Sequence, residues 1–405
     1  MATQRSKSFE VGQRFSVNIE KVAHGGHFIA RHEGQVIFVR HGIPGEVVEI
    51  EITSTGSSFH RADVIDVKQS SPDRIVPLCE YSRPGGCGGC DFQHIAIERQ
   101  RMLKADVIRE QFSRIAKQEI EIKVEEVAAP LHWRTRVSSA TNAQGQLGFY
   151  ASRTHTVIPV SDCQIATASI NFPELAARKW PARSRIEISV SSSGSRSIAI
   201  ADSSRDSKAR LTQGDAILHE EVQGHDLQVS QSSFWQSHEI APEALTEAII
   251  GFVKDGDHVL DLYGGVGLFT AALIDVVGAT GQIDLIESGS SATADARKNF
   301  AQYSNIRIHT GEVGRTLQKI DSADVVVLDP PREGAGKEVI AQIVDKHPRA
   351  IVYIACDPAA LARDTSYLAE LGFSLGSLRA FDLFPMTHHI ECVALFEKAS
   401  ANRVS

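Results

Sequence analysis

One cysteine near the C-terminal end of the chain, Cys356, has the sequence setting of a reactive thiol. It follows an apolar, β-branched run at 350–355 that is typical of a buried parallel strand, and Pro358 favours the first turn of a helix. Cys356 and Asp357 are therefore expected at the carboxyl edge of a sheet, where open α/β sheets bind ligands. A helix N-terminus and a nearby cation, with Arg363 as the candidate, would lower the pKa of this thiol. The alternative is a core cysteine without chemistry.

A second group of thiols lies in a glycine-rich segment, as Cys79, Cys87 and Cys90. Only glycines separate Cys87 from Cys90, and their freedom of backbone conformation lets the thiols converge. Zinc or an iron–sulfur cluster would each need a fourth ligand, and Cys163 is the best candidate because the remaining two cysteines lie in the C-terminal half. Six cysteines in 405 residues are too few for a disulfide scaffold. Their clustering favours a metal or cluster in a reducing cytosol.

The C-terminal half alternates strands and helices, which predicts a doubly wound α/β sheet. Its first strand, 258–262, runs into the glycine-rich stretch 263–269, where the backbone can approach a ligand at a helix N-terminus. The next strand ends in Glu287, where a carboxylate can hold an adenosine ribose, and a later strand ends in Asp329. The glycine loop lacks both the Gly-x-Gly-x-x-Gly spacing and a Walker lysine. We therefore interpret it as an S-adenosylmethionine site rather than a dinucleotide site.

These elements predict three domains. Short strands with glycine and proline turns at 1–68 indicate a small OB-like β-barrel, 69–227 forms a central α+β domain with the cysteine cluster, and 228–405 holds the doubly wound sheet. A long amphipathic helix is expected over 95–118, with Lys104 among the basic residues of its solvated face. Basic and aromatic residues alternate at 133–137, a weak indication of a nucleic-acid surface.

Composition limits the classes of function. No run of about eighteen apolar residues exists, so no membrane span is expected. The first residues lack the apolar segment of a secretory signal, so we expect a cytoplasmic protein. A net charge of −8 argues against a protein coated in basic surface but allows a local basic groove for RNA.

The motifs, taken together, closely resemble RNA 5-methyluridine methyltransferases. The resemblance is carried, in the order found in that family, by 234–236, 261–267, 329–332, 356–364 and 384–391. Fragments at 30–31, 36–39 and 42–46 make the N-terminal barrel look like a TRAM domain, an RNA-binding module. The resemblance covers almost the whole chain, and its cysteine and glutamate motifs are the most specific. It implies a class I, S-adenosylmethionine-dependent methyltransferase fold.

The resemblance also implies roles for individual residues. Cys356 would be the nucleophile that attacks uracil C6, and Glu391 the base that removes the C5 proton. The residues lining the cofactor site would be Gln236, Tyr263, Glu287 and Asp329. The cysteines that match the ligands of a [4Fe–4S] cluster in the ribosomal-RNA members are Cys79, Cys87, Cys90 and Cys163. Asp357 stands where an asparagine usually follows the cysteine, and its charge would disfavour the thiolate.

Because the four cysteines match those of the ribosomal-RNA members, the resemblance implies ribosomal RNA, in particular 23S rRNA, as the substrate. We expect the enzyme to be a monomer. Three alternatives remain open at this point. The first is a 5-methyluridine methyltransferase acting on transfer RNA. The second is a methyltransferase acting on an amine, although Arg332 stands where such enzymes carry an aromatic after Asp-Pro-Pro. The third is a non-enzymatic RNA-binding or redox-sensing protein that uses the cluster and the barrel.

Overall fold

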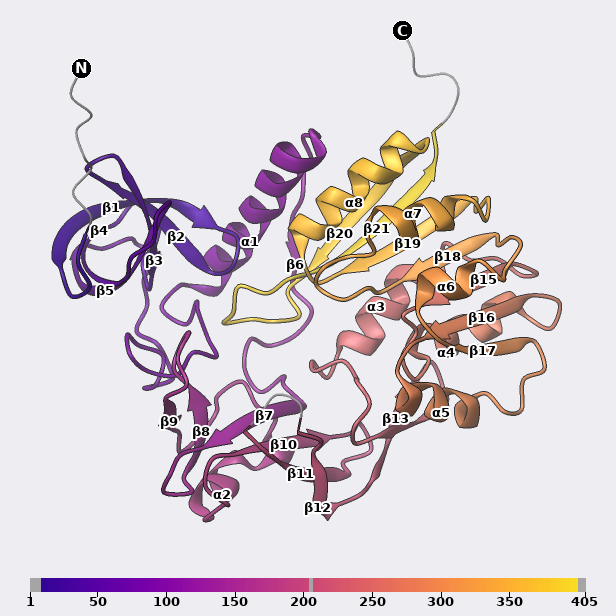
Figure 1. The fold of residues 1–405 in the computed structure, drawn as a ribbon, viewed down its shortest axis with the longest axis horizontal. Coiled ribbons are helices and arrows are strands. Elements are labelled where there is room, and N and C mark those ends of the chain that lie inside the picture. Colours follow the sequence, from indigo (N-terminus) through magenta and orange to yellow (C-terminus); the bar gives the residue numbers. More distant parts are fainter. Residues whose placement is uncertain (1–8, 204–206, 400–405) are drawn as a thin grey trace, which may run out of the picture.

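The computed structural model describes residues 9–203 and 207–399 and contains a barrel, a central sheet and a large mixed sheet (Figure 1). The barrel closes in the order β1-β2-β3-β5-β4. Alternate residues of its strands point inward, so that Phe28, Ile37 and Val39 are fully buried. Its strands are β1 (Arg14–Ala23), β2 (His27–His32), β3 (Gln35–Arg40), β4 (Val47–Ser54) and β5 (His60–Gln69). The expected OB-like barrel is confirmed.

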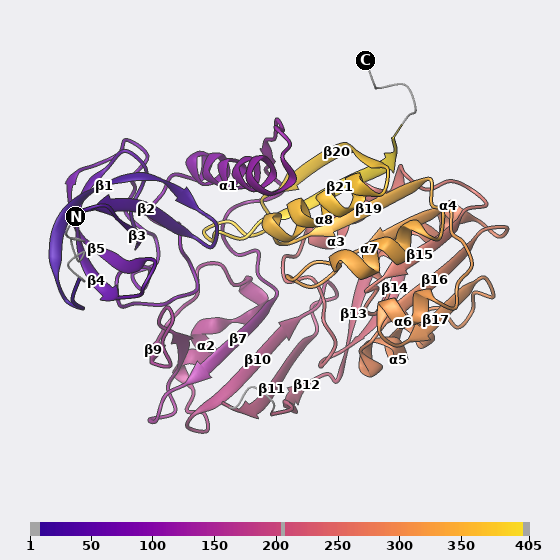
Figure 2. The ribbon, with the colours of Figure 1, turned by 45° about the horizontal axis from the view of Figure 1, so that its top comes forward.

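A long helix follows the barrel and lies between it and the large sheet (Figure 1, Figure 2). It consists of α1 (Ile97–Gln111) and a π-helical turn, η1 (Phe112–Ala116). Leu103, Ile108 and Phe112 share its buried stripe, as expected. The prediction for Lys104 was wrong, because this side chain is buried rather than solvated. Its partner is a carboxylate from the far end of the chain, which local helical periodicity cannot reveal.

The central sheet has six strands in the order β12-β11-β10-β7-β8-β9. Its elements are β7 (Arg136–Thr141), β8 (Leu147–Tyr150), β9 (Val157–Pro159), η2 (Ala168–Ile170), α2 (Phe172–Ala177), β10 (Ser184–Val190), β11 (Arg196–Asp202) and β12 (Arg210–Gly214). A hairpin of β13 (Ile217–Val222) and β14 (His225–Ser230) then packs against the large sheet's helix α5 (Ser290–Asn299) through hydrogen bonds from β14 to Asp295 and Asn299. The predicted boundary at residue 227 falls within β14.

The large sheet has the order β17-β16-β15-β18-β19-β21-β20-β6, with helices on both faces. Its first five strands run parallel, and β21 runs antiparallel to both neighbours. The strands are β6 (Val124–Glu125), β15 (His258–Leu262), β16 (Gln282–Glu287), β17 (Ile306–Thr310), β18 (Val325–Leu328), β19 (Ala350–Ala355), β20 (Phe373–Phe381) and β21 (Glu391–Lys398). The remaining helices are α3 (Ala241–Ile250), α4 (Leu268–Val277), α6 (Val313–Leu317), α7 (Gly336–Val344) and α8 (Pro358–Glu370). The doubly wound α/β sheet is confirmed.

The loop between β20 and β21, residues 382–390, leaves the sheet and reaches toward the barrel and α1 in both views (Figure 1, Figure 2). Two buried side chains of α1 hold it. Gln100 accepts a hydrogen bond from the backbone N–H of Met386 at 2.9 Å, and Lys104 pairs with Asp382 at 2.5 Å. The loop that precedes Glu391 is therefore fixed by the helix that follows the barrel. Among the described residues, no helix is long and apolar enough to cross a membrane.

Candidate active site and cysteine cluster

The turn that carries Cys356 begins at the end of a fully buried strand. All six residues of β19 are buried, and Asp357 ends the strand by capping α8. Its Oδ1 accepts hydrogen bonds from the backbone N–H groups of Ala359 and Ala360, each at 2.9 Å. Asp is a favoured N-cap residue, and Pro358 suits the first helical position. The predicted strand-to-helix turn at the sheet's carboxyl edge is confirmed.

The sheet register brings a carboxylate beside this cysteine. Ala355 of β19 lies opposite Cys392 of the antiparallel strand β21. Cys356, which follows β19, therefore lies beside Glu391, the first residue of β21, and the Glu391 carboxylate acts on the thiol. Glu391 is only 4% exposed. Its burial, together with the charge of Asp329, raises its pKa well above its ordinary value.

The surroundings of Cys356 favour the thiol over the thiolate. Burial, followed by the carboxylates of Glu391 and Asp329, raises the pKa of Cys356 to about 12, while the Arg332 guanidinium opposes the rise. The expectation that Arg363 activates the thiol was wrong. Its guanidinium pairs with Asp364 at 2.7 Å and donates to a backbone carbonyl. Arg332, from the motif after β18, is the cation that acts on Cys356.

The expected cofactor residues lie around the glycine loop after β15. Gln236, Tyr263 and Asp329 line one cavity with Gly264 and Gly265. The amide Nε2 of Gln236 lies 3.5 Å from Oδ2 of Asp329. The structure thus brings three of the four residues together in one cavity.

The fourth residue, Glu287, lies at the loop's other side. It accepts hydrogen bonds from the backbone N–H of Gly265 at 3.2 Å and from that of Gly289 at 2.5 Å. Below the loop, Asp261 is fully buried and accepts two hydrogen bonds from Thr270. Burial raises the pKa of Asp261 to about 6 despite these bonds.

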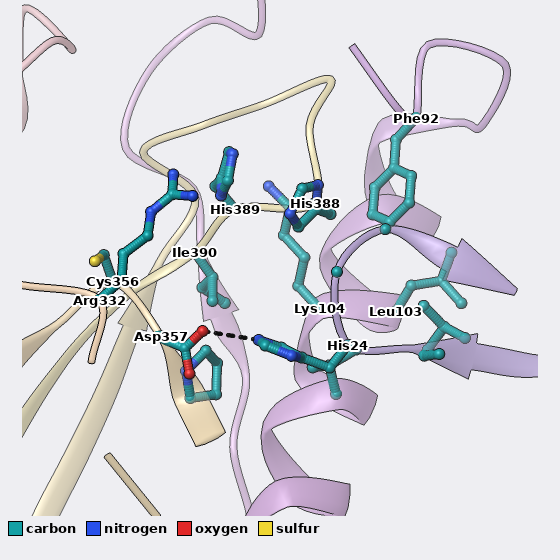
Figure 3. Close-up of a pocket in the computed structure, with 16 residues that line it drawn as sticks. His24, Phe92, Leu103, Lys104, Arg332, Cys356, Asp357, His388, His389 and Ile390 are labelled. Carbon is teal, nitrogen blue, oxygen red and sulfur yellow. Dashed lines mark ion pairs between the residues drawn. The ribbon is translucent and has the colours of Figure 1, made fainter. Parts of the chain in front are cut away.

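A second cavity of about 220 Å³ lies between the barrel and the turn that carries Cys356 (Figure 3). Cys356, Arg332, His388 and His389 contribute to its wall, and apolar residues of α1 form another part. Burial lowers the pKa of His389 to about 3, so this ring is neutral near pH 7. His24 of the barrel, which sequence reasoning gave no role in the site, faces Asp357 across the cavity at 3.0 Å.

Four cysteines line a third cavity of about 210 Å³, as expected from their sequence grouping. Cys79, Cys87, Cys90 and Cys163 all have free thiols. No three His, Cys, Asp or Glu side chains in the described ranges converge closely enough to hold a single metal ion.

A part-buried cation, Arg134, lies beside these thiols. Arg134 lines the same cavity, and its Nε donates to the backbone carbonyl of Arg136 at 2.9 Å. Among the described residues, no carboxylate forms an ion pair with it. The guanidinium also lies 5.9 Å from the centroid of the Trp133 ring, and thiolates around an anionic cluster would give it an anionic partner. The donor set therefore fits a cluster. The predicted nucleic-acid surface at 133–137 was wrong for Trp133, which is 1% exposed.

Two regions of the chain match known families. Residues 8–65 match the TRAM domain, and residues 191–399 match the family described as tRNA (Uracil-5-)-methyltransferase. A Streptomyces avermitilis protein named uncharacterized RNA methyltransferase is 39% identical, over 96% of this chain and 99% of the relative. The 23S rRNA (uracil(1939)-C(5))-methyltransferase RlmD of Shewanella piezotolerans is 28% identical, over 97% of each chain.

A solved structure also shares the fold. The tRNA (uracil-54, C5)-methyltransferase of Pyrococcus abyssi, in complex with S-adenosyl-L-homocysteine, superposes with a TM-score of 0.73 at 19% identity. The match covers 94% of this chain and 99% of that chain. Barrel, central sheet and doubly wound sheet therefore occur together in another protein.

Proposed function

Since the chain belongs to the family of RNA (uracil-5-)-methyltransferases, we propose that it methylates uridine C5 by covalent catalysis, with Cys356 as nucleophile and Glu391 as base. The family uses S-adenosylmethionine, which supplies an electrophilic methyl group when bound. One observation carries the assignment of roles. The register of β19 and β21 brings Cys356 beside Glu391, the first residue of β21, at the edge of the sheet where the glycine loop lies.

The chemistry explains why both residues are needed. Uracil C5 is a poor nucleophile until the Cys356 thiolate bonds to C6 and the C5–C6 π electrons move onto the C4 carbonyl as an enolate. C5 would then attack the methyl carbon of S-adenosylmethionine, whose S–CH3 bond would break with its electron pair returning to sulfur, so that S-adenosylhomocysteine would be the leaving group. Glu391 takes the C5 proton, the C5–C6 double bond re-forms, and the electrons of the S–C6 bond return to Cys356 as thiolate. A carboxylate whose pKa is raised by burial is the stronger base for this step.

The remaining residues of the site assist the nucleophile, bind the cofactor or contact the RNA. Arg332 is the cation that favours the Cys356 thiolate, since the neighbouring carboxyls oppose it. Gln236, Tyr263 and Asp329 bind the cofactor in the cavity that they line, and Glu287 holds its ribose beside Gly265. Extruding the target base costs a few kcal/mol, less in a loop, and the TRAM domain supplies further contacts with the RNA.

The four cysteines hold a [4Fe–4S] cluster in this proposal. Two observations support it, the lining of one cavity by four free thiols and the part-buried Arg134 beside them, which forms no ion pair with a carboxylate among the described residues. Methyl transfer moves no net electrons, so the cluster has a structural role, with Cys79, Cys87 and Cys90 joined to Cys163 across the central domain.

Ribosomal RNA is the proposed substrate, acted on by a monomer. The relative that acts on 23S rRNA matches nearly the whole chain, and the four-cysteine set points the same way. Transfer RNA is the second candidate, because the enzyme with the shared fold acts on it. Tritium release from 5-[³H]uridine RNA decides between them. We expect release from 23S rRNA fragments and not from total tRNA, with 5-methyluridine mapped to one rRNA position; release from tRNA alone would overturn the assignment.

A further inference from the structure

The barrel contributes a short hairpin to the catalytic centre. Residues 24–26, between β1 and β2, line the cavity beside Cys356. A Cβ at Gly26 would lie only 2.8 Å from the ring of His388, and Gly26 has a φ of +78°, so only glycine fits this approach. One residue of the hairpin thus packs against the loop that leads to Glu391. Another, His24, reaches the turn that carries Cys356.

The two carboxylate oxygens of Asp357 have different hydrogen-bond partners. Oδ1 of Asp357 caps α8, whereas Oδ2 lies 3.0 Å from Nε2 of His24 (Figure 3). Burial opposes ionisation of Asp357, but the bond from His24 and the two capping bonds together lower its pKa. Asp357 is therefore a carboxylate, directly adjacent in sequence to Cys356, and its charge raises the pKa of the thiol.

We propose that His24 is a positioning residue that neutralises Asp357 and so permits the Cys356 thiolate to form when the barrel is docked. The inference rests on the proposed function, because it assumes that Cys356 is the nucleophile. It assigns the barrel a second task beside binding RNA. The hairpin completes the electrostatic environment of the nucleophile, and a barrel displaced from the cavity would leave the carboxylate of Asp357 uncompensated.

The charged groups around His24 determine the pH range of this effect. Its hydrogen bond to Asp357 raises the pKa of His24 despite partial burial, and Arg114 of η1 opposes the rise. Arg332, Lys104, His388 and His389 complete the titratable lining of the cavity, together with Cys356 itself. His24 is thus protonated, and the compensation complete, below its raised pKa. The compensation is lost as the pH rises through that value.

The test reads the thiolate without RNA or cofactor. The alkylation rate of Cys356 by iodoacetamide is followed by mass spectrometry of its peptide, at about pH 6 and about pH 9. We expect His24→Ala to slow alkylation roughly tenfold at the lower pH, the effect of one pKa unit on the thiolate fraction. The difference should shrink as the pH rises through the raised pKa of His24, and above that pKa the two rates should agree within about twofold.

The same His24→Ala substitution, made in the Asp357→Asn protein, separates an effect of charge on Cys356 from an effect of packing. Asp357→Asn removes the charge and keeps the N-cap, because asparagine accepts the same backbone N–H groups. In that background His24→Ala should change the rate at neither pH. His219→Ala is the matched control, since His219 pairs with Asp226 at 2.8 Å on the β13–β14 hairpin, outside the cavity. It should alkylate like the wild type.

Two outcomes would overturn the inference. In the first, His24→Ala slows the alkylation of Cys356 equally at both pH values. In the second, His24→Ala still slows it in the Asp357→Asn background. Either result assigns His24 a packing role alone. Neither outcome touches the proposed function, which is read by tritium release. Conversely, absence of tritium release with the expected alkylation pattern would reject the function and leave the ion pair's effect established.

Discussion

Replacing the buried Lys104 by methionine should destabilise the protein by about 3 kcal/mol. Lys104 and Asp382 are 1% and 2% exposed, with Nζ and Oδ1 2.5 Å apart, and Nζ also donates to the Phe384 carbonyl at 3.0 Å. Removing one partner of a buried ion pair costs about 3–5 kcal/mol, because the other charge stays in the interior. The lower value applies here because Arg101 lies 3.4 Å from the second oxygen of Asp382.

Three variants of the Lys104–Asp382 pair should differ in stability in a defined order. Asp382→Ala should be worse than Lys104→Met, since it leaves the ammonium with only a backbone carbonyl. The double variant K104M/D382L should return to within about 1 kcal/mol of the wild type, because it removes both charges and fills the space. Lys21→Met is the control. Lys21 also joins the barrel to α1, through Glu110 at 2.6 Å, but its side chain is 51% exposed, so its loss should cost under about 1 kcal/mol.

Urea unfolding followed by tryptophan fluorescence measures these differences. Trp133 is a suitable reporter, because its ring contacts Phe384 of the same loop at a centroid distance of 5.9 Å. The reasoning is refuted if Lys104→Met unfolds like Lys21→Met, or if the double variant is less stable than Lys104→Met.

Three further predictions concern the nucleophile, the cysteines and the buried acid below the glycine loop. Cys356→Ala should abolish methylation while S-adenosylmethionine affinity, measured by calorimetry, stays within a few-fold, because the thiol acts on the base; measurable turnover would contradict this. Protein purified without oxygen should be brown and contain about four irons per chain, and Cys90→Ser should lose both; stoichiometric zinc in place of iron would reject the cluster. Asp261→Asn should flatten the dependence of melting temperature on pH. The folded pKa of Asp261, about 6, lies above its ordinary 3.8, so the stability that Asp261 contributes is fully present below the ordinary value and is lost as pH rises through about 6. Equal slopes for both proteins between these pH values would contradict the assignment.

Much of the fold was predictable because its signals are local. The run 350–355 is continuously apolar, and Asp357 with Pro358 fixes where α8 begins. The order of five motifs, of which those with Cys356 and Glu391 are the most specific, identified the family. Their placement side by side needed the register of β21 against β19, which single-sequence patterns do not give.

What the sequence could not reveal depends on partners far apart in the chain. Lys104 has the pattern of a surface lysine, and only the carboxylate of Asp382 explains its burial. Arg363 is an exception, because the partner that holds it, Asp364, is its immediate neighbour in the sequence. His24 belongs to a barrel with its own core, and nothing in its local sequence predicts that its hairpin reaches the catalytic turn.

The account's central claim is that Glu391 removes the C5 proton from a covalent Cys356 adduct, and Glu391→Gln tests it most directly. The amide can fill the site and allow attack and methyl transfer, but it cannot accept the proton, and loss of a general base costs about 10²- to 10⁴-fold in rate. With ordinary uridine RNA, a slowly migrating band that RNase removes should accumulate in denaturing gels, and Cys356→Ala in the same chain should abolish it. Turnover near wild type with no adduct would contradict the account and assign the proton to His388, His389 or water.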